Sequence, residues 1–334
     1  MEDKNKTYSD GWDPTEYEIY TKEETEKESA EIPLNTGEDE VLPKKRKSKK
    51  SKRKAVTTAV AVIILIAALA CGYFFLKDRV LPGENNSGGG SSPIIKSSVR
   101  VTFPEGYTVY QMAQLLEENK VCSAEDFMKA ADTPVDGIEI DNADERVFLL
   151  EGYLFPDTYD FYIGEDAQSV VKRFIKNYNS KVGEATKQKA RQLGYTMDEM
   201  LTLASIIQKE CDKDIAECQN VSSVFHNRLK QSKNSYLGSD VTYFYLKNMA
   251  EHLGGSESEE FDRYLLNYYT YSPYRKGLPA GPICNPGLKA IEAAVSPANT
   301  NYIYFLTDAS GEKFYYAETY EQHLKNGKEA GIMN

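Results

Sequence analysis

The sequence predicts an α+β protein in which a single N-terminal transmembrane helix precedes a small α/β module and a larger mixed α+β domain. Three features support this fold class: an uncharged apolar run, helical patterns that begin at good N-cap residues, and paired alternating segments near the C-terminus. With 334 residues, of which 41% are hydrophobic and 27% charged, the chain can form a sizeable core.

Charge is unevenly distributed along the chain. Residues 1–43 carry 14 acidic and 4 basic side chains, and residues 44–54 carry 9 basic and no acidic ones. Residues 1–54 have almost no periodic apolar pattern, so we expect a disordered tail that ends in a basic run. The remainder has a net charge of −10, which argues against nucleic acid as a partner because binding to phosphates needs positive charge.

Residues 55–76 are the predicted transmembrane helix. These 22 residues contain no charge, and about 20 apolar residues are enough to span a bilayer. The basic run just before them places the N-terminus in the cytoplasm and the C-terminal part outside. We therefore expect a protein that crosses the cell membrane once. One alternative is a cleaved signal peptide, which the long preceding segment disfavours. The other is a lipoprotein signal at residues 68–71, in which Ala68 stands where leucine is expected.

A flexible linker and a small module follow the predicted span. The linker at residues 77–96 is rich in glycine, serine and asparagine. In the module, residues 97–131, an alternating strand at residues 99–103 precedes two helices. Thr108 and Ser123 are the predicted N-caps of these helices.

The larger domain is expected at residues 145–334. Residues 303–306 and 313–316 read as two strands of an antiparallel hairpin. Five cysteines without a CxxC pair and three histidines show no zinc-site spacing. We therefore expect neither a metal nor a cofactor.

Glu210 is the candidate catalytic residue. Thr196 and Glu199 match a capping box, which predicts a helix that continues through Met200 and Ile207. On this helix Glu210 lies within the apolar stripe, whereas Lys209 points to the opposite side. Burial raises the pKa of a carboxyl group, as a general acid requires. The alternative is an exposed or ion-paired residue at the helix end.

Cys211 and Cys218 are close enough in sequence to be considered for a disulfide. In one continuous helix their Cα atoms are about 10.5 Å apart, beyond the roughly 7 Å that a disulfide tolerates. We therefore expect free thiols unless the helix breaks around residues 212–214.

Several segments resemble the signatures of a known family. They are residues 149–159 (LLEGYLFPDTY), 204–210 (ASIIQKE), 224–229 (VFHNRL), 237–242 (LGSDVT), 277–287 (GLPAGPICNPG) and 293–298 (AAVSPA). In this order, over about 190 residues, they resemble the endolytic murein transglycosylases of the YceG-like family. The anchor also fits, and residues 97–131 resemble the family's LysM-like subdomain.

The resemblance implies a lyase that cuts peptidoglycan glycan strands between N-acetylmuramic acid and N-acetylglucosamine. One glutamate first protonates the glycosidic oxygen and then accepts the proton of the C6 hydroxyl, which closes a 1,6-anhydro ring. No water is consumed, so the second carboxylate of a glycosidase pair is not needed. The implied partners are glycan strands, the cell membrane and proteins of wall synthesis.

The resemblance also identifies candidate site residues. Where the family often has a first glutamate, this chain has Gln208, so Glu210 inherits the catalytic role. Substrate-binding candidates within or next to the matching segments are Asn227, Arg228, Ser239, Asp240, Glu151 and Tyr271. The tyrosine-rich segment at residues 268–274 departs from the family pattern in composition and in its spacing to Gly277.

Two other functions stay open at this point. A non-catalytic scaffold that binds peptidoglycan predicts that Glu210 is dispensable. An ordinary hydrolase predicts a second carboxylate and a positioned water near Glu210. Esterase and nucleotide chemistry lack support, because the sequence contains neither a GxSxG motif nor a phosphate-binding glycine loop.

Overall fold

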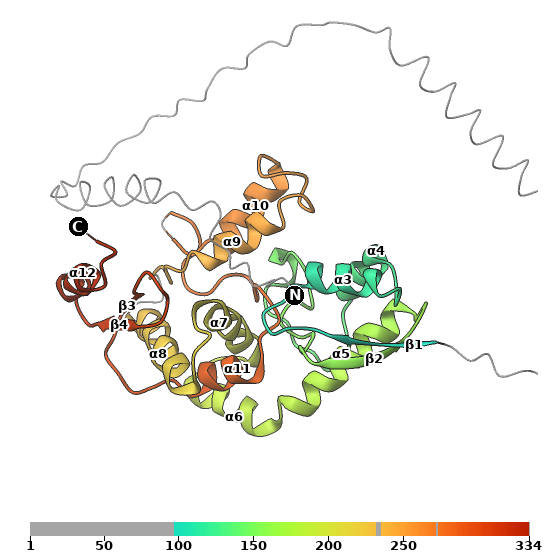
Figure 1. Cartoon of the computed structure of the whole chain (residues 1–334), viewed down its shortest axis with the longest axis horizontal. Coiled ribbons are helices and arrows are strands. Elements are labelled where there is room, and N and C mark those ends of the chain that lie inside the picture. Colours follow the sequence, from blue (N-terminus) through green and yellow to red (C-terminus); the bar gives the residue numbers. More distant parts are fainter. Residues whose placement is uncertain (1–96, 232–234, 272, 334) are drawn as a thin grey trace, which may run out of the picture. The chain divides into compact units, whose positions relative to one another are not determined.

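The computed structural model describes residues 97–231, 235–271 and 273–333, and these form part of one compact unit, residues 91–334. Figure 1 shows a mixed α+β arrangement, as the sequence predicts. The predicted tail, transmembrane helix and linker lie outside the described residues. No helix in the described part of the chain is long and apolar enough to cross a membrane.

The elements follow one another as a strand, two helices, a short 3-10 helix, a second strand, seven helices, a hairpin and a last helix. In order they are β1 (Ser98–Thr102), α3 (Val109–Glu118), α4 (Ala124–Ala131), η1 (Ala143–Glu145), β2 (Thr158–Tyr162), α5 (Ala167–Lys181), α6 (Glu184–Leu193), α7 (Met197–Glu210), α8 (Ile215–Gln231), α9 (Val241–Asn248), α10 (Glu259–Tyr268), α11 (Leu288–Val295), β3 (Tyr304–Thr307), β4 (Phe314–Ala317) and α12 (Tyr320–Glu329).

The predicted N-terminal module has the expected strand and both helices. Thr108 caps α3 in a capping box with Gln111, and Ser123 caps α4. The partner of β1 is β2, in an antiparallel register that sets Ser98 opposite Tyr162. Since β2 lies within residues 145–334, the two predicted segments share one sheet.

An aromatic cluster fills the space between this sheet and α5. Phe174 of α5 lies 5.0 Å from Phe103 and 4.5 Å from Tyr159, measured between ring centroids. All three side chains are buried. Their packing couples the β1–β2 sheet to α5 and contributes much of this part of the core.

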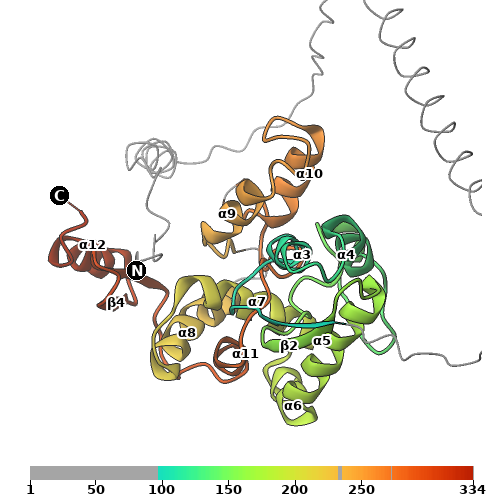
Figure 2. The same cartoon turned by 45° about the vertical axis from the view of Figure 1, so that its right-hand side comes forward.

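Helix α7 lies among the other helices of the unit (Figure 2). It packs against α11, α8, α6 and α9. Thr196 and Glu199 form the predicted capping box, and Met200, Leu203 and Ile206 are fully buried. The apolar stripe read from the sequence therefore faces the core.

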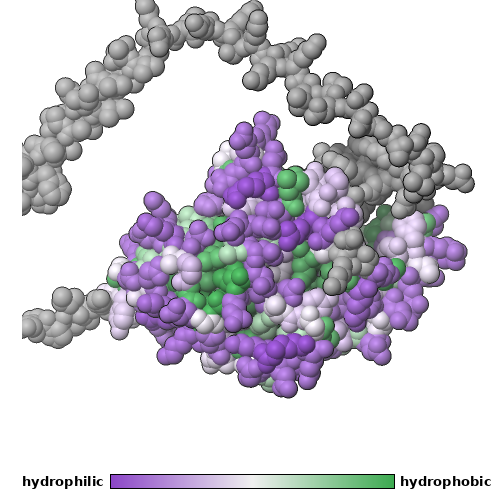
Figure 3. Space-filling model, turned by 180° about the vertical axis from the view of Figure 1, so that it is seen from behind, coloured by the Kyte–Doolittle hydropathy of each residue, from purple (hydrophilic) through white to green (hydrophobic). Residues whose placement is uncertain are grey.

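The C-terminal part adds a hairpin and a helix to this core. β3 and β4 pair antiparallel, with Tyr304 opposite Ala317, which confirms the predicted hairpin. Helix α12 packs on both strands, and Asn326 donates a hydrogen bond to the Tyr316 carbonyl oxygen at 2.9 Å. The face in Figure 3 is mostly hydrophilic, with apolar patches interrupted by polar residues.

The side chain of Asn285 joins three distant segments of the chain. Its Oδ1 accepts hydrogen bonds from the backbone amides of Gly152 and Leu154, both at 2.9 Å. Its Nδ2 donates to the Tyr107 carbonyl oxygen at 3.0 Å and to Oε1 of Glu151 at 2.8 Å. Asn285 is fully buried, so each of these bonds compensates a polar group that has lost water.

A buried ion pair links the segment before β2 to the start of α7. Arg146 and Asp198 form this pair, and the Tyr153 hydroxyl donates to Asp198 Oδ1 at 2.6 Å. Burial raises the pKa of Asp198 although the Arg146 charge opposes the rise. Loss of one partner would leave an uncompensated buried charge.

We predict that Asn285→Asp strongly destabilises the fold, by about 3 kcal/mol or more in free energy of unfolding. The substitution replaces the amide nitrogen, which donates to the Tyr107 carbonyl oxygen and to Oε1 of Glu151, by a buried carboxylate oxygen that leaves both acceptors without this donor. Urea denaturation of the variant measures the loss. Asn248→Asp, at an exposed position of α9, is the control, and equal stability of both variants would contradict the prediction.

Candidate active site

Glu210 is the last residue of α7. The helix ends there because Cys211 has an extended backbone (φ −142°, ψ 113°). This position also puts the carboxyl group at the negative end of the helix dipole, which disfavours the charged form. The residue as a whole is partly exposed, whereas its carboxyl group is desolvated.

The Ser239 hydroxyl donates a hydrogen bond to Oε1 of Glu210 at 2.6 Å. Desolvation and then the nearby charge of Asp240 raise the pKa of Glu210 to about 7, against the lowering effects of Ser239 and Arg228. A carboxyl group with this pKa is present in both protonation states near neutral pH. It can therefore give up a proton and later accept one.

Two buried threonines hold the loop that carries Ser239. Thr270 Oγ1 accepts from the Ser239 amide at 3.1 Å, and the Thr270 carbonyl oxygen accepts from the Gly238 amide at 2.9 Å. Thr242 donates to the Ser239 carbonyl oxygen at 2.7 Å. Gly238 adopts φ +66°, a conformation that glycine reaches without strain. Sequence reasoning missed Thr242 and Thr270, although both lie in segments compared with the family.

Arg228 supports the same loop from α8. Its Nη1 donates to the carbonyl oxygens of Leu237 at 2.7 Å and Gly238 at 3.0 Å, and its Nε to that of Ile303 at 2.7 Å. Asn227 next to it donates to the carbonyl oxygens of Thr300 and Tyr302, at 2.8 and 3.0 Å. Both predicted residues thus hold backbone that surrounds the site.

Glu151 lies elsewhere in the core. It is fully buried and accepts hydrogen bonds from the Val109 amide at 3.0 Å, from Asn285 and from the Tyr245 hydroxyl at 3.4 Å. Its carboxyl group thereby caps the N-terminus of α3. Desolvation raises its pKa to about 8.

Asp240 and Tyr271 flank the Ser239 loop. Asp240 precedes α9, and burial raises the pKa of its carboxyl group. A Cβ atom at Gly238 would lie 3.9 Å from the Tyr271 ring, so this tyrosine contacts the loop. Tyr269 lies 5.4 Å from Tyr271 and 5.5 Å from Tyr243 between ring centroids, and all three rings are partly exposed.

Gln208 does not share the surroundings of Glu210. Its Oε1 accepts from the Gly287 amide at 2.9 Å, at the start of α11. The two side chains therefore point to different parts of the molecule, as the helical spacing predicts.

A cavity of about 560 Å³ is separate from this site. Its lining includes Asp198, Thr202 and Arg275, and none of the predicted site residues. The described residues contain no cluster of histidine, cysteine, aspartate or glutamate that can hold a metal ion.

Comparison with known proteins places this geometry in context. The sequence model of the YceG-like family matches residues 84–329. A Bacillus subtilis endolytic murein transglycosylase is 36% identical over 177 residues, 53% of this chain and 46% of that protein. A Streptococcus pneumoniae protein of the same name is 27% identical over 280 residues, 76% of this chain and 49% of its own length. The chain thus spans about half the length of these curated relatives.

A solved structure shares the fold. The crystal structure of a YceG-like protein from Listeria monocytogenes superposes with a TM-score of 0.55 and 28% sequence identity. The match covers 68% of this chain and 75% of that one.

We predict that Ser239→Ala raises the pKa of Glu210 by about one unit, because the variant loses a hydrogen bond that favours the carboxylate. Carbon-13 NMR titration of the glutamate carboxyl groups measures this pKa directly. Ser310→Ala, at an exposed position of the hairpin loop, should leave the titration unchanged. A fall of the Glu210 pKa in Ser239→Ala would contradict the assigned contact.

We predict that Glu151→Gln makes stability less dependent on pH. The folded-state pKa of Glu151, about 8, lies above the ordinary 4.5, so folding binds a proton between these values and stability falls as pH rises through them. Glutamine preserves the acceptor for Val109 and Asn285 but carries no charge. At pH 9 the variant should unfold several degrees above wild type, and at pH 5 close to it, in thermal scans. A larger advantage at pH 5 would reverse the sign and refute the argument.

Proposed function

Because the chain belongs to the YceG-like family, which its match over residues 84–329 shows, we propose that it is an endolytic lytic transglycosylase of peptidoglycan. The proposed reaction cleaves the bond between N-acetylmuramic acid and N-acetylglucosamine and leaves 1,6-anhydro ends. The names of the two relatives support this activity. The observation that carries the proposal is the desolvated carboxyl group of Glu210, hydrogen-bonded to Ser239.

In this reaction Glu210 acts twice. Its protonated form donates to the glycosidic oxygen as the bond at C1 of the muramic acid breaks. The resulting carboxylate is stabilised by the Ser239 hydroxyl and the Arg228 charge. It then accepts the proton of the C6 hydroxyl, whose oxygen attacks C1. A pKa of about 7 suits both steps because neither protonation state is strongly disfavoured near neutral pH.

The proposed glycan-binding surface lies around the Ser239 loop. Asp240 is partly exposed and can meet sugar hydroxyls, and Tyr271 offers a partly exposed ring beside Tyr269. Ser239 is buried and contributes by its hydrogen bond to Glu210. Flat aromatic rings suit the apolar faces of sugars. Asn227 and Arg228 contribute by holding the surrounding backbone, and Glu151 does so through the N-terminus of α3.

The proposed location is the outer side of the cell membrane. Residues 55–76 serve as the single-pass anchor, with residues 1–54 in the cytoplasm and residues 77–96 as linker. The strand–helix–helix–strand order of β1, α3, α4 and β2 supports a LysM-like module in the N-terminal part of the described unit. Nascent glycan strands and proteins of wall synthesis are the proposed partners.

Glu210→Gln tests the activity. The full-length protein and the variant are incubated with purified peptidoglycan, and mass spectrometry of the released muropeptides distinguishes anhydro ends from reducing ends by one water. We expect anhydro ends from wild type and at least a hundredfold fewer from the variant, because glutamine has no proton to donate.

A matched control keeps this test interpretable. Glu292→Gln, exposed on α11, should retain wild-type activity. Reducing ends would point to a hydrolase, and anhydro ends from Glu210→Gln would contradict its catalytic role. No product from wild type would favour the peptidoglycan-binding scaffold.

A further inference from the structure

The segment that contains Cys211 and Cys218 is not one continuous helix. Helix α7 ends at Glu210 and α8 begins at Ile215, so the expectation of one continuous helix is wrong and the alternative of a break is confirmed. The two thiols consequently meet, with their Sγ atoms 2.8 Å apart. Both are buried, with exposed fractions of 2% and 0%.

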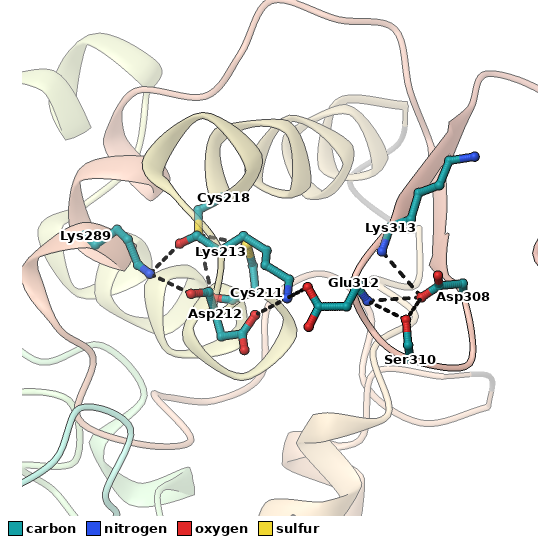
Figure 4. A network of polar contacts seen from close by, with 9 residues as sticks. All are labelled: Cys211, Asp212, Lys213, Cys218, Lys289, Asp308, Ser310, Glu312 and Lys313. Carbon is teal, nitrogen blue, oxygen red and sulfur yellow. Dashed lines mark hydrogen bonds and ion pairs between the residues drawn. The ribbon is translucent and has the colours of Figure 1, made fainter.

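Neighbouring side chains hold this break in place, as Figure 4 shows. Lys289 of α11 donates to the carbonyl oxygens of Asp212 and Lys213, at 3.1 and 2.5 Å. Lys213 forms an ion pair of 3.0 Å with Glu312 of the β3–β4 loop. Contacts that do not involve sulfur therefore hold the backbone between Cys211 and Cys218, and the Cys218 thiol adds contacts of 3.6 and 3.8 Å to the carbonyl oxygens of Cys211 and Lys213.

Other roles for the pair find less support. A metal site needs further ligands, and no such cluster exists among the residues described here. The other cysteines of the described chain lie apart: Cys284 donates to the Ser205 carbonyl oxygen at 3.4 Å, and Cys122 follows α3. A hydrogen bond between two free thiols is weak, whereas their proximity suits a covalent bond.

We propose that Cys211 and Cys218 form an intramolecular disulfide in the mature protein, directly after the catalytic residue. The proposal goes beyond the proposed reaction but rests on the proposed location for its oxidant. Outside the cytoplasm thiols are oxidised by thiol–disulfide exchange. The oxidant is a disulfide of the dithiol oxidoreductase class, which reacts while the segment is still folding and accessible.

The exchange balances in two steps. One cysteine thiolate attacks a sulfur atom of the oxidant's disulfide and releases one oxidant thiolate. The second cysteine thiolate then attacks the protein sulfur of the mixed disulfide and releases the other. The pair loses two electrons and two protons, and the oxidant becomes a dithiol.

The new bond closes a short ring across the helix break. Because the ring starts at the residue after Glu210, it restrains the end of α7 that presents the catalytic carboxyl group.

Peptide mapping tests the bond itself. Cells that produce the full-length protein are quenched with acid, free thiols are blocked with N-ethylmaleimide in denaturant, and the protein is digested with trypsin without reductant. Cleavage after Lys209, Lys213 and Arg228 yields ECDK and DIAECQNVSSVFHNR. We expect them joined, two hydrogens lighter than their sum, and separated by reduction. Recovery of both peptides as maleimide adducts would overturn the proposal without affecting the transglycosylase assignment.

Thermal unfolding tests the effect of the Cys211–Cys218 disulfide on stability. Reductant should lower the melting temperature of the wild-type protein by roughly 5 °C and leave the double variant Cys211→Ser/Cys218→Ser unchanged. Cys284→Ser is the control and should remain sensitive to reductant. Each single variant should lower the melting temperature as much as the double variant does, because the loss of either cysteine abolishes the disulfide. Additive losses would indicate packing of two independent thiols instead.

Discussion

The buried amide of Asn285 is the interaction on which the rest of the described unit depends. It holds the turn at residues 152–154, the approach to α3 at Tyr107 and the carboxyl group of Glu151. All of these groups lie more than a hundred residues before Asn285 in the sequence. The same turn brings Gly152 so close to Pro282 that a Cβ atom would lie 2.5 Å from its ring. Helix α11 and the N-terminal helices are thereby placed on either side of α7 (Figures 1 and 2).

Local signals made part of this structure predictable. Thr108, Ser123 and Thr196 cap the helices that the sequence predicts, because an N-cap acts on an amide only two or three residues away. The hairpin at β3 and β4 is likewise local. Glu210 was identified from helical spacing and a family resemblance, and the structure gives its carboxyl group the raised pKa that this reasoning requires.

Contacts between distant segments were beyond such reasoning. The pairing of β1 with β2 crosses two helices, and no local pattern specifies it. The break at residues 211–214 depends on Lys289 and Glu312, which lie about eighty and a hundred residues downstream. The family segments marked Ser239 as a candidate, but its contact with Glu210 and its support by Thr270 needed the three-dimensional arrangement.

Because Thr270 holds the loop that carries Ser239, the order in which the chain is synthesised decides when the site can form. A ribosome that has reached residue 240 has already produced Glu210 and its hydrogen-bond partner, but not the threonine that fixes the partner's loop. Asn285 and α11, which α7 packs against, follow still later. Until these segments have been made, the emerging chain carries a glutamate without the contacts that desolvate and hold it. Its carboxyl group acquires its distinct acidity only after Thr270 and α11 have been synthesised.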